Sequence, residues 1–365
     1  MKITQIETLV AHDVAVVRVR TDDGAEGIGQ TAPFMADITA AVLHRLVADS
    51  FLGQNPWDVK ALVRECLRRR YKYTGTFLLR ALCGVDTAIY DLLGNITGQP
   101  VYRLLGGATR TEIPLYASRM ARHTSPEEEV GVLHAAAAEG FKAAKIKISG
   151  RMNHDIDAAP GRTETLIALA RREMGDDFTL YADANGGCSV PGAVRVGHML
   201  QDHNFAFFEE PCPFTDIEST AQVAAALTIP IAGGEQDNLL PQFQRMIAQH
   251  AVSIVQADVG YVGGITQAQQ VAQMALHAGL PFIPHSSNHA MQWIFSLHLI
   301  ATLPQSASYY EYGYDPKGRS FTELYEPALT VREGTAYLSD RPGWGLTLCA
   351  VFIRQAESRL STVDD

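Results

Sequence analysis

Seven ionisable residues stand at nearly regular intervals between positions 147 and 311 of this 365-residue sequence. Each ends or follows a short apolar run, and successive members lie 23 to 36 residues apart. One strand-plus-helix repeat has about that length, so each residue can occupy the same end of a successive parallel strand. Side chains placed in this way meet at one edge of a sheet and can act together. The seven residues are Lys147, Asp183, Glu209, Glu235, Asp258, His285 and Glu311.

Three of these residues, Asp183, Glu209 and Glu235, are carboxylates expected on neighbouring strands. Without a cation they would repel one another and raise their own pKa values. A donor set of oxygens without Cys or His favours Mg²⁺, with Mn²⁺ as a substitute, over zinc. Asn185, two residues after Asp183, faces the same way and could support the metal or contact the substrate. Glu210 points the other way along its strand and is interpreted as a structural charge.

The remaining members indicate acid–base chemistry. Lys145 and Lys147 share one face of a strand, and repulsion between them and from the cation is expected to lower both pKa values. A neutral lysine can then remove a proton from carbon. Asp258 and His285 are expected at the ends of adjacent strands on the opposite side, where the carboxylate fixes the imidazole tautomer of a second acid–base group. Glu311, if protonated, could donate a hydrogen bond to a developing enolate oxygen.

The elements that position these residues alternate between apolar strands and helices. One helix is expected to begin at Ser125, with Pro126 in its first position, and to end at Gly140. Eight such β units predict a parallel sheet that closes into a barrel. The expected strands are residues 113–117, 144–148, 179–182, 206–208, 229–232, 254–256, 282–284 and 308–311.

The N-terminal third has a different pattern. Strand-like runs flank a turn at Asp22-Asp23-Gly24, and helical periodicity follows from about residue 37 to 105, which is typical of an α+β domain. The tail after about residue 321 breaks the barrel rhythm and is expected to return to this domain. The predicted division is therefore a cap of residues 1–112, a barrel of residues 113–320 and a returning segment of residues 321–365.

The composition restricts the class of protein. Hydrophobic residues make up 47% of the chain and charged residues 19%, as in a globular protein with a sizeable core. The net charge of −10 gives no general attraction to nucleic acid or anionic membranes. We see neither an apolar run long enough for a bilayer nor a signal peptide. The five scattered cysteines form no C-x-x-C pair, which favours a reducing cytoplasm.

Together these motifs resemble the mandelate racemase subgroup of the enolase superfamily. The resemblance covers nearly the whole chain and implies a modified TIM barrel, (β/α)7β, with an α+β capping domain built from the N-terminal region and the C-terminal tail. It rests on Lys145-Ile146-Lys147, Asp183-Ala184-Asn185, Glu209-Glu210-Pro211, Gly234-Glu235, Asp258, His285 and Glu311, and on the stretches 84–94, 98–100 and 104–107.

The resemblance also implies roles. Asp183, Glu209 and Glu235 would bind Mg²⁺, while Lys147 and the His285–Asp258 pair would flank the α-carbon of a carboxylate substrate. In the same way Lys145 would help to bind the carboxylate, and Glu311 would support the enolate. Members of the family are usually cytoplasmic homo-oligomers, often dimers or octamers.

Three functions are compatible with this pattern. The favoured one is dehydration of a sugar acid (an aldonate or aldarate) through an enediolate to a 2-keto-3-deoxy acid, a choice based on family analogy. The alternative is racemisation or epimerisation of a 2-substituted carboxylate, with Lys147 and His285 on opposite faces. A remote third reading is an inactive binding protein on the same fold.

Residues that would select the substrate are less marked. The first hairpin has only a short connection at residues 11–13, which would leave a roomy pocket. Lys72, Tyr73 and Arg119 are candidate partners for hydroxyl groups or a distal carboxylate, although ordinary loop polarity explains them equally well. The long polar segment 149–162 is expected to form a rim over the site.

Overall fold

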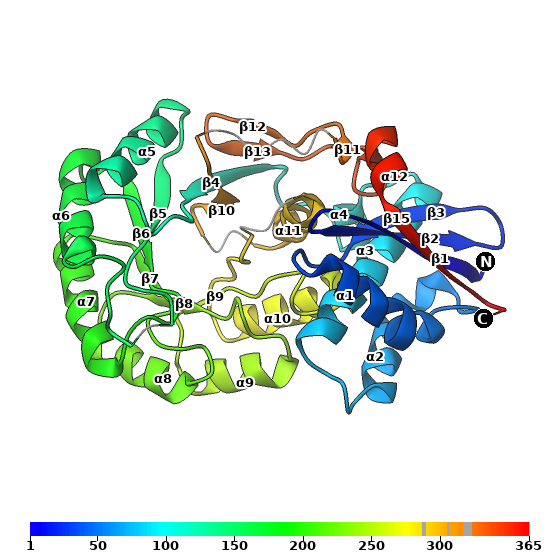
Figure 1. Ribbon diagram of the computed structural model, residues 1–365, viewed down its shortest axis with the longest axis horizontal. Helices are drawn as coiled ribbons and strands as arrows, with labels where there is room; N and C mark the ends of the chain where they lie inside the picture. The colour runs from blue at the N-terminus through cyan, green and yellow to red at the C-terminus, as the bar shows by residue number, and fades with distance from the viewer. Residues whose placement is uncertain (153, 287–289, 305–306, 317–322, 365) are drawn as a thin grey trace.

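The computed structural model describes residues 1–152, 154–286, 290–304, 307–316 and 323–364. Two sheets dominate it: an antiparallel capping sheet at one end and a mostly parallel barrel-like sheet at the other (Figure 1). The two sheets confirm the predicted barrel with an α+β cap. None of the helices within the described ranges is both long and apolar enough to cross a membrane.

The cap consists of an antiparallel sheet and the helices packed on it. Its first three strands follow one another in the sheet, and the long helix α3 lies against them. The elements are β1 (Ile3–Ala11), β2 (Val14–Thr21), β3 (Glu26–Gln30), α1 (Ala36–Val42), the short helices η1 (Leu43–Val47), η2 (Ala48–Ser50) and η3 (Pro56–Asp58), α2 (Val59–Arg69), α3 (Thr76–Thr97) and α4 (Val101–Leu104).

Two glycines fix the geometry of this cap. Gly24 adopts a φ of 83° in the predicted turn between β2 and β3, a conformation that costs glycine little. A Cβ atom on Gly27 would lie 2.3 Å from the carbonyl oxygen of Ala88, so α3 approaches β3 at backbone contact distance. Larger residues at position 27 would push the helix off the sheet.

The barrel-like sheet has the order expected for a β/α repeat. Strands β4 to β9 follow one another in parallel, β10 closes back on β4, and Phe282 forms an isolated parallel bridge to Val255. The elements are β4 (Glu112–Ser118), α5 (Pro126–Ala138), β5 (Ala143–Lys147), α6 (Arg162–Met174), β6 (Thr179–Asp183), α7 (Val190–Asp202), β7 (Phe207–Glu209), α8 (Ile217–Ala226), β8 (Ile231–Gly233), α9 (Leu240–Ala248), β9 (Ile254–Val255), α10 (Ile265–His277), α11 (Met291–Thr302) and β10 (Tyr310–Gly313).

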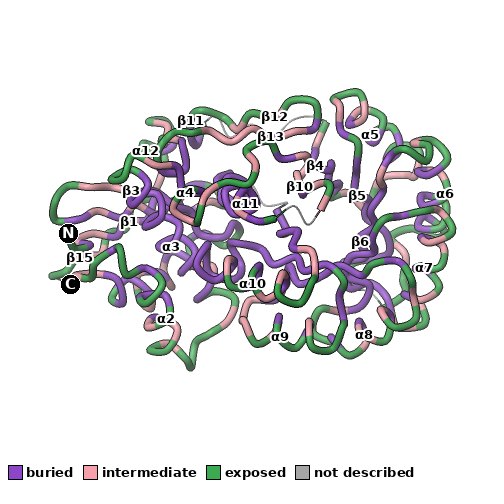
Figure 2. Tube along the Cα trace, turned by 180° about the vertical axis from the view of Figure 1, so that it is seen from behind, coloured by how far each residue is buried: buried purple, intermediate pink, exposed green. Residues whose placement is uncertain are grey.

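The helices surround the strands on the outside, as Figure 1 shows for α5 to α9. Helix α5 begins as predicted: Ser125 accepts a hydrogen bond from the backbone N–H of Glu128, and the Glu128 side chain accepts one from Ser125 N. Figure 2 shows the barrel strands and α3 buried, with exposed residues on the outer helix faces. The strand ends are therefore held by a rigid, apolar scaffold.

The C-terminal tail contacts both parts of the molecule. Strand β15 pairs antiparallel with β1, whereas β13 pairs antiparallel with β4 of the barrel-like sheet. The predicted boundaries at residues 112 and 320 remain a proposal, and the second lies among residues 317–322, outside the described ranges. The tail elements are β11 (Tyr325–Glu326), β12 (Thr330–Arg332), β13 (Thr335–Tyr337), β14 (Thr347–Leu348), α12 (Ala350–Gln355) and β15 (Glu357–Thr362).

Two buried carboxyl groups on α3 hold the parts of the molecule together. Asp91 accepts hydrogen bonds from the backbone N–H groups of Ile28 and Trp344, both at 2.8 Å, and so joins the cap sheet, α3 and the tail. Asp86 accepts one from Thr266 N in the first turn of α10, at 3.2 Å. Burial raises the pKa of each of these two aspartates to about 7.

Candidate metal centre and acid–base site

The strand register brings the predicted ionisable residues to one edge of the barrel-like sheet. Lys147 pairs with Asp183 across β5 and β6, and Asp183 pairs with Glu209 across β6 and β7. Glu235 follows β8 after Gly234, which turns the chain with a φ of 113°. Three successive strand ends therefore present three carboxylates to the same space.

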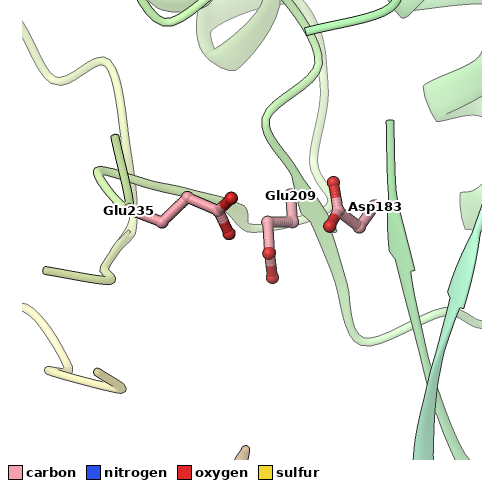
Figure 3. A group of neighbouring side chains, drawn as sticks. All are labelled: Asp183, Glu209 and Glu235. Atoms are coloured by element: carbon pink, nitrogen blue, oxygen red, sulfur yellow. The ribbon is translucent and has the colours of Figure 1, made fainter. Parts of the chain in front are cut away.

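Asp183, Glu209 and Glu235 form a compact acidic group, which we call the carboxylate triad. One oxygen from each lies within 4.8 Å of the others, and all three side chains are buried (Figure 3). Burial, opposed by Lys145, raises the pKa of Glu209 to about 8. Glu235 Oε2 is buried and accepts no hydrogen bond within the described part of the chain.

This donor set fits a hard divalent cation. Three carboxylates from three strands supply oxygen ligands, and an unsatisfied buried oxygen of Glu235 remains available to a cation. A cation would also relieve the repulsion that raises the pKa of Glu209. The triad can therefore hold a metal ion.

Lys145 is a buried countercharge to the site. Its Nζ lies 2.6 Å from Glu209 Oε1 and 2.8 Å from Glu311 Oε1, and the side chain is fully buried. Burial alone would lower the pKa of Lys145, but Glu209 and Glu311 outweigh it and raise this pKa well above its usual value. The expected lowering is therefore wrong for Lys145, because the carboxylates stand closer than a second lysine.

Lys147 lies at one end of the triad. Its ammonium group donates a short hydrogen bond to Asp183 Oδ2 and another, of 3.2 Å, to Asn185 Oδ1. Asp183 is ionised, since Lys147 and Lys145 overcome the effect of burial and lower its pKa. Asn185, with a φ of 43°, also receives a 2.7 Å hydrogen bond from Arg122 Nη2.

His285 lies at the other end. Its Nδ1 is 2.7 Å from Asp258 Oδ2, and its Nε2 is 3.4 Å from Glu235 Oε2. The backbone N–H groups of Gly260 and Tyr261 donate to Asp258 Oδ1 and fix that carboxylate. Against the effect of burial, Glu235 and Glu311 raise the pKa of His285 well above its usual value. The Asp258 contact places a proton on Nδ1 and turns Nε2 toward the triad.

Glu311, at the end of β10, has several donors. Ser118 Oγ donates to Oε1 at 2.7 Å and the backbone N–H of Ser286 donates to Oε2 at 2.8 Å. Although burial opposes it, Lys145 and His285 lower the pKa of Glu311 to about 2. The expectation of a protonated Glu311 is therefore corrected: Glu311 is ionised and shares Lys145 with Glu209.

The candidate specificity residues Arg119, Lys72 and Tyr73 do not join the strand-end group. Arg119 donates to the buried carboxylate of Glu129 at 2.8 Å and to the carbonyl oxygen of Tyr314, so its guanidinium is occupied within the protein rather than by a substrate. Lys72 and Tyr73 are exposed, and Lys72 Nζ lies 5.8 Å from the Tyr71 ring centroid. Within the described part of the chain, neither side chain makes a hydrogen bond or ion pair with the strand-end residues.

Three residues near the site were not singled out as participants by sequence reasoning. Gln256 donates from Nε2 to Glu209 Oε2 at 2.8 Å; its position two residues before Asp258 was the signal that could have found it. Burial, reinforced by Glu235, raises the pKa of Glu210 well above its usual value, and Glu210 Oε2 accepts a 3.2 Å hydrogen bond from Asn185 Nδ2, a contact that the interpretation as a structural charge did not include. Arg122 lies in an irregular loop, where no periodicity marks it.

The segment 149–162 lies beside this edge. Gly150 N donates to Ile156 O, and Met152 N donates to Asn185 O at 3.1 Å. Asp155 N donates to Gly187 O in the loop after β6. The segment is thus fastened to the loop that carries Asn185, and residue 153 lies outside the described ranges. Its expected role as a rim stays a prediction.

Two family descriptions match the chain. Residues 2–106 match the N-terminal domain of mandelate racemase and muconate lactonizing enzyme, and residues 130–350 match the enolase C-terminal domain-like family. Among curated relatives, arabinonate dehydratase of Saccharolobus solfataricus is 29% identical and covers 94% of this chain and 91% of its own. L-talarate/galactarate dehydratase of Salmonella typhimurium is 28% identical over 92% of this chain and 80% of its own.

Solved structures are similar over the whole chain. A protein from Roseobacter denitrificans, provisionally described as a racemase, has a TM-score of 0.95 at 41% identity, with both chains fully covered. A mandelate racemase/muconate lactonizing protein from Paracoccus denitrificans, solved in complex with magnesium, has a TM-score of 0.91 at 30% identity. That match covers 100% of this chain and 99% of the other.

Proposed function

The chain belongs to the mandelate racemase and muconate lactonizing enzyme family of the enolase superfamily, and on that premise we propose that it is a Mg²⁺-dependent sugar-acid dehydratase. The observation that carries the proposal is the order of groups along the site. Lys147 contacts Asp183 at one end of the carboxylate triad, and His285 contacts Glu235 at the other. Two acid–base groups on either side of a candidate metal site suit a reaction that needs a base and an acid on opposite sides.

We infer that Asp183, Glu209 and Glu235 hold Mg²⁺, with Mn²⁺ as a substitute. The magnesium complex of the Paracoccus relative supports this choice. When bound, the ion would polarise the substrate carboxylate and lower the energy of the negative charge that develops on it. Lys145, 2.8 Å from Glu311 and 2.6 Å from Glu209, adds a fixed positive charge where the same carboxylate would bind.

The chain's own groups then move the protons. One of Lys147 and His285 removes the α-proton, and the C–H electron pair moves into the carboxylate to give an enediolate. The group at the opposite end protonates the β-hydroxyl, which leaves as water as the electrons return to form the Cα–Cβ double bond. The enol so formed tautomerises to a 2-keto-3-deoxy acid. Asp258 holds the imidazole of His285 in the orientation that this transfer needs.

The dehydratase relatives support elimination, whereas the Roseobacter relative supports a second candidate, racemisation or epimerisation. In that reaction the opposite group returns a proton to the other face of the α-carbon and no water leaves. The same two residues serve both reactions, so the outcome depends on the substrate bound between them.

A screen of sugar acids tests the proposal. Metal-loaded protein is incubated with each acid in ²H₂O; keto-acid formation is read by a carbonyl assay, and α-proton exchange and configuration by NMR. We expect the wild-type protein to form keto acid from at least one sugar acid. Lys147→Ala and His285→Asn should abolish this activity, whereas Lys142→Ala, which changes an exposed lysine near the same strand, should keep it. Inverted acid without keto acid would favour the epimerase; no exchange at all, or wild-type rates in both variants, would refute these roles.

Two further proposals concern the protein as a whole. We expect a cytoplasmic homo-oligomer, a dimer or octamer, by analogy with the family. Light scattering coupled to size-exclusion chromatography would measure its mass, and a monomer at micromolar concentration would contradict the expectation.

A further inference from the structure

Arg122 lies in the loop between β4 and α5 and reaches the acid–base site from the side. Its Nη2 donates to Asn185 Oδ1 at 2.7 Å, and the same oxygen accepts a hydrogen bond from Lys147 Nζ. The guanidinium is half-buried and lies close enough to Asp183 and Glu235 to interact with both charges. Arg122 is therefore linked through Asn185 to Lys147, which on the proposed function would act at the α-carbon of the substrate.

This guanidinium has no carboxylate partner within the described part of the chain. Its Nε is buried and donates no hydrogen bond there, whereas Arg119 in the same loop is paired with Glu129. Arg162, at the start of α6, uses its donors on the carbonyl oxygens of Lys147 and Thr124. Arg122 alone of these three arginines keeps a buried donor unused.

The neighbouring loop adds to the positive charge. Arg151, exposed in the segment after β5, lies near enough for its charge to repel that of Arg122, and Arg162 acts in the same direction. No ion pair is made by Arg151 either, as far as the chain is described. Like charges from separate loops that make no direct ion pair are stabilised when an anion binds between them.

The reacting carboxylate does not supply this anion. On the proposed function it lies between the metal and Lys145, whereas the hydrogen bond of Arg122 is to Asn185, which also accepts from Lys147. A hydroxyl group could accept a hydrogen bond from Arg122 but would leave its charge unpaired. A second carboxylate satisfies both the unused donor and the charge, because the planar guanidinium matches its two oxygens.

We propose that Arg122 binds a second, distal carboxylate of the substrate, and that the enzyme therefore acts on diacids (aldarates) rather than on monoacids (aldonates). The inference rests on the proposed function and narrows it. Arg122 is a specificity residue: it sets which acid binds, while Lys147 and His285 perform the proton transfers.

The test compares pairs of sugar acids that have the same configuration and differ only in a terminal carboxylate or hydroxymethyl group. We expect kcat/KM to be about 10- to 100-fold higher for the diacid, since hydrogen bonds between charged groups are the strong ones. Arg122→Gln should remove this preference mainly by raising KM for the diacid, with less than about a threefold change for the monoacid. Arg172→Gln, which alters an exposed arginine paired with Glu173, should keep the preference.

Calorimetric binding gives the same comparison without turnover. Dissociation constants of both acids are measured on metal-loaded Lys147→Ala protein, with and without Arg122→Gln. Equal affinity for the two acids, or an equal loss for both acids in the Arg122→Gln protein, would overturn the assignment and leave the proposed function standing. If neither acid exchanges its α-proton in wild-type protein, the proposed function fails, and the calorimetric ratio still decides whether Arg122 selects a diacid.

Discussion

Replacement of Lys145 by methionine should destabilise the metal-free protein strongly. The Lys145 ammonium is fully buried, 2.6 Å from Glu209 and 2.8 Å from Glu311, and it is the only cation within 3 Å of these two carboxylates in the described chain. Methionine fills a similar volume without the charge. The substitution therefore removes one partner of a buried ionic cluster and leaves the other in place.

The size of the effect follows from the charge left behind. Glu311 is ionised, with a pKa lowered to about 2, whereas Glu209, with a pKa raised to about 8, is mostly protonated at pH 7. Loss of Lys145 thus strands about one buried carboxylate, and breaking a buried pair in this way costs roughly 3–5 kcal/mol. For a chain of 365 residues that corresponds to a decrease in Tm of roughly 4–7 °C.

Thermal unfolding of wild type, Lys145→Met and Lys142→Met, each in EDTA and in saturating Mg²⁺, measures this. Lys142 is exposed at the start of the same strand region, and its replacement should change stability by less than about 0.5 kcal/mol. Mg²⁺ at about 100 times its Kd adds about 2.7 kcal/mol to wild type. The gain should be larger in Lys145→Met, where no ammonium competes with the metal for Glu209.

The result that refutes this reasoning is a Lys145→Met protein that melts within about 1 °C of wild type in EDTA, where the predicted shift is several times larger. Equal destabilisation by Lys142→Met would refute it as well. In either case Lys145 would not be the countercharge of the cluster, and its proposed role toward the substrate carboxylate would lose its structural basis.

Three further predictions concern stability and metal dependence. Asp91→Ala leaves the buried N–H groups of Ile28 and Trp344 without an acceptor and should cost about 2–5 kcal/mol in urea unfolding. A loss below about 1 kcal/mol would contradict the role of Asp91 in joining the cap sheet, α3 and the tail. Burial lowers the pKa of His298 to about 3 in the folded protein, whereas the unfolded state has a pKa of about 6.5. As the pH falls below about 6.5 only the unfolded state takes up this proton, so the folded protein loses stability on acidification. Between pH 7 and pH 5 the wild-type protein should lose about 2 kcal/mol of stability in this way. The loss should vanish in His298→Asn, which keeps an acceptor for Tyr102 N. Parallel pH profiles of the two proteins would contradict this role of His298. Removal of divalent metal with EDTA should abolish keto-acid formation, and Mg²⁺ or Mn²⁺ should restore it; full activity in EDTA would contradict a catalytic metal.

The strand-end residues could be predicted because periodicity constrains them. A side chain that ends a parallel strand has one direction to face, and one repeat length carries the next residue to the neighbouring strand. The pairing of Lys147 with Asp183, and of Asp183 with Glu209, shows how directly sequence spacing becomes register. The same spacing predicts that Gln256, two residues before Asp258, faces the site, where its amide donates to Glu209.

The loops and the protonation states could not be predicted in this way. Arg119 and Arg122 stand three residues apart in one loop, and nothing in their spacing says that Glu129 takes the first and leaves the second near Asn185. That choice depends on where α5 places Glu129 in space. The pKa of Lys145 likewise depends on which carboxylates approach it within 3 Å, a distance that only the folded structure supplies.

The charges at the strand ends also explain why this site would bind a metal ion. Asp183, Glu209 and Glu311 converge on Lys145, and Glu235 has a buried oxygen without a donor in the described chain. Even with Lys147 on Asp183 and His285 beside Glu235, these four carboxylates are one positive charge short, which is consistent with the raised pKa of Glu209. A divalent ion would supply the missing charge and leave Lys145 to face the substrate carboxylate. The acidic excess that destabilises the empty site would thus hold the divalent ion, and the positive charge of that ion would stabilise the second negative charge that develops on the substrate.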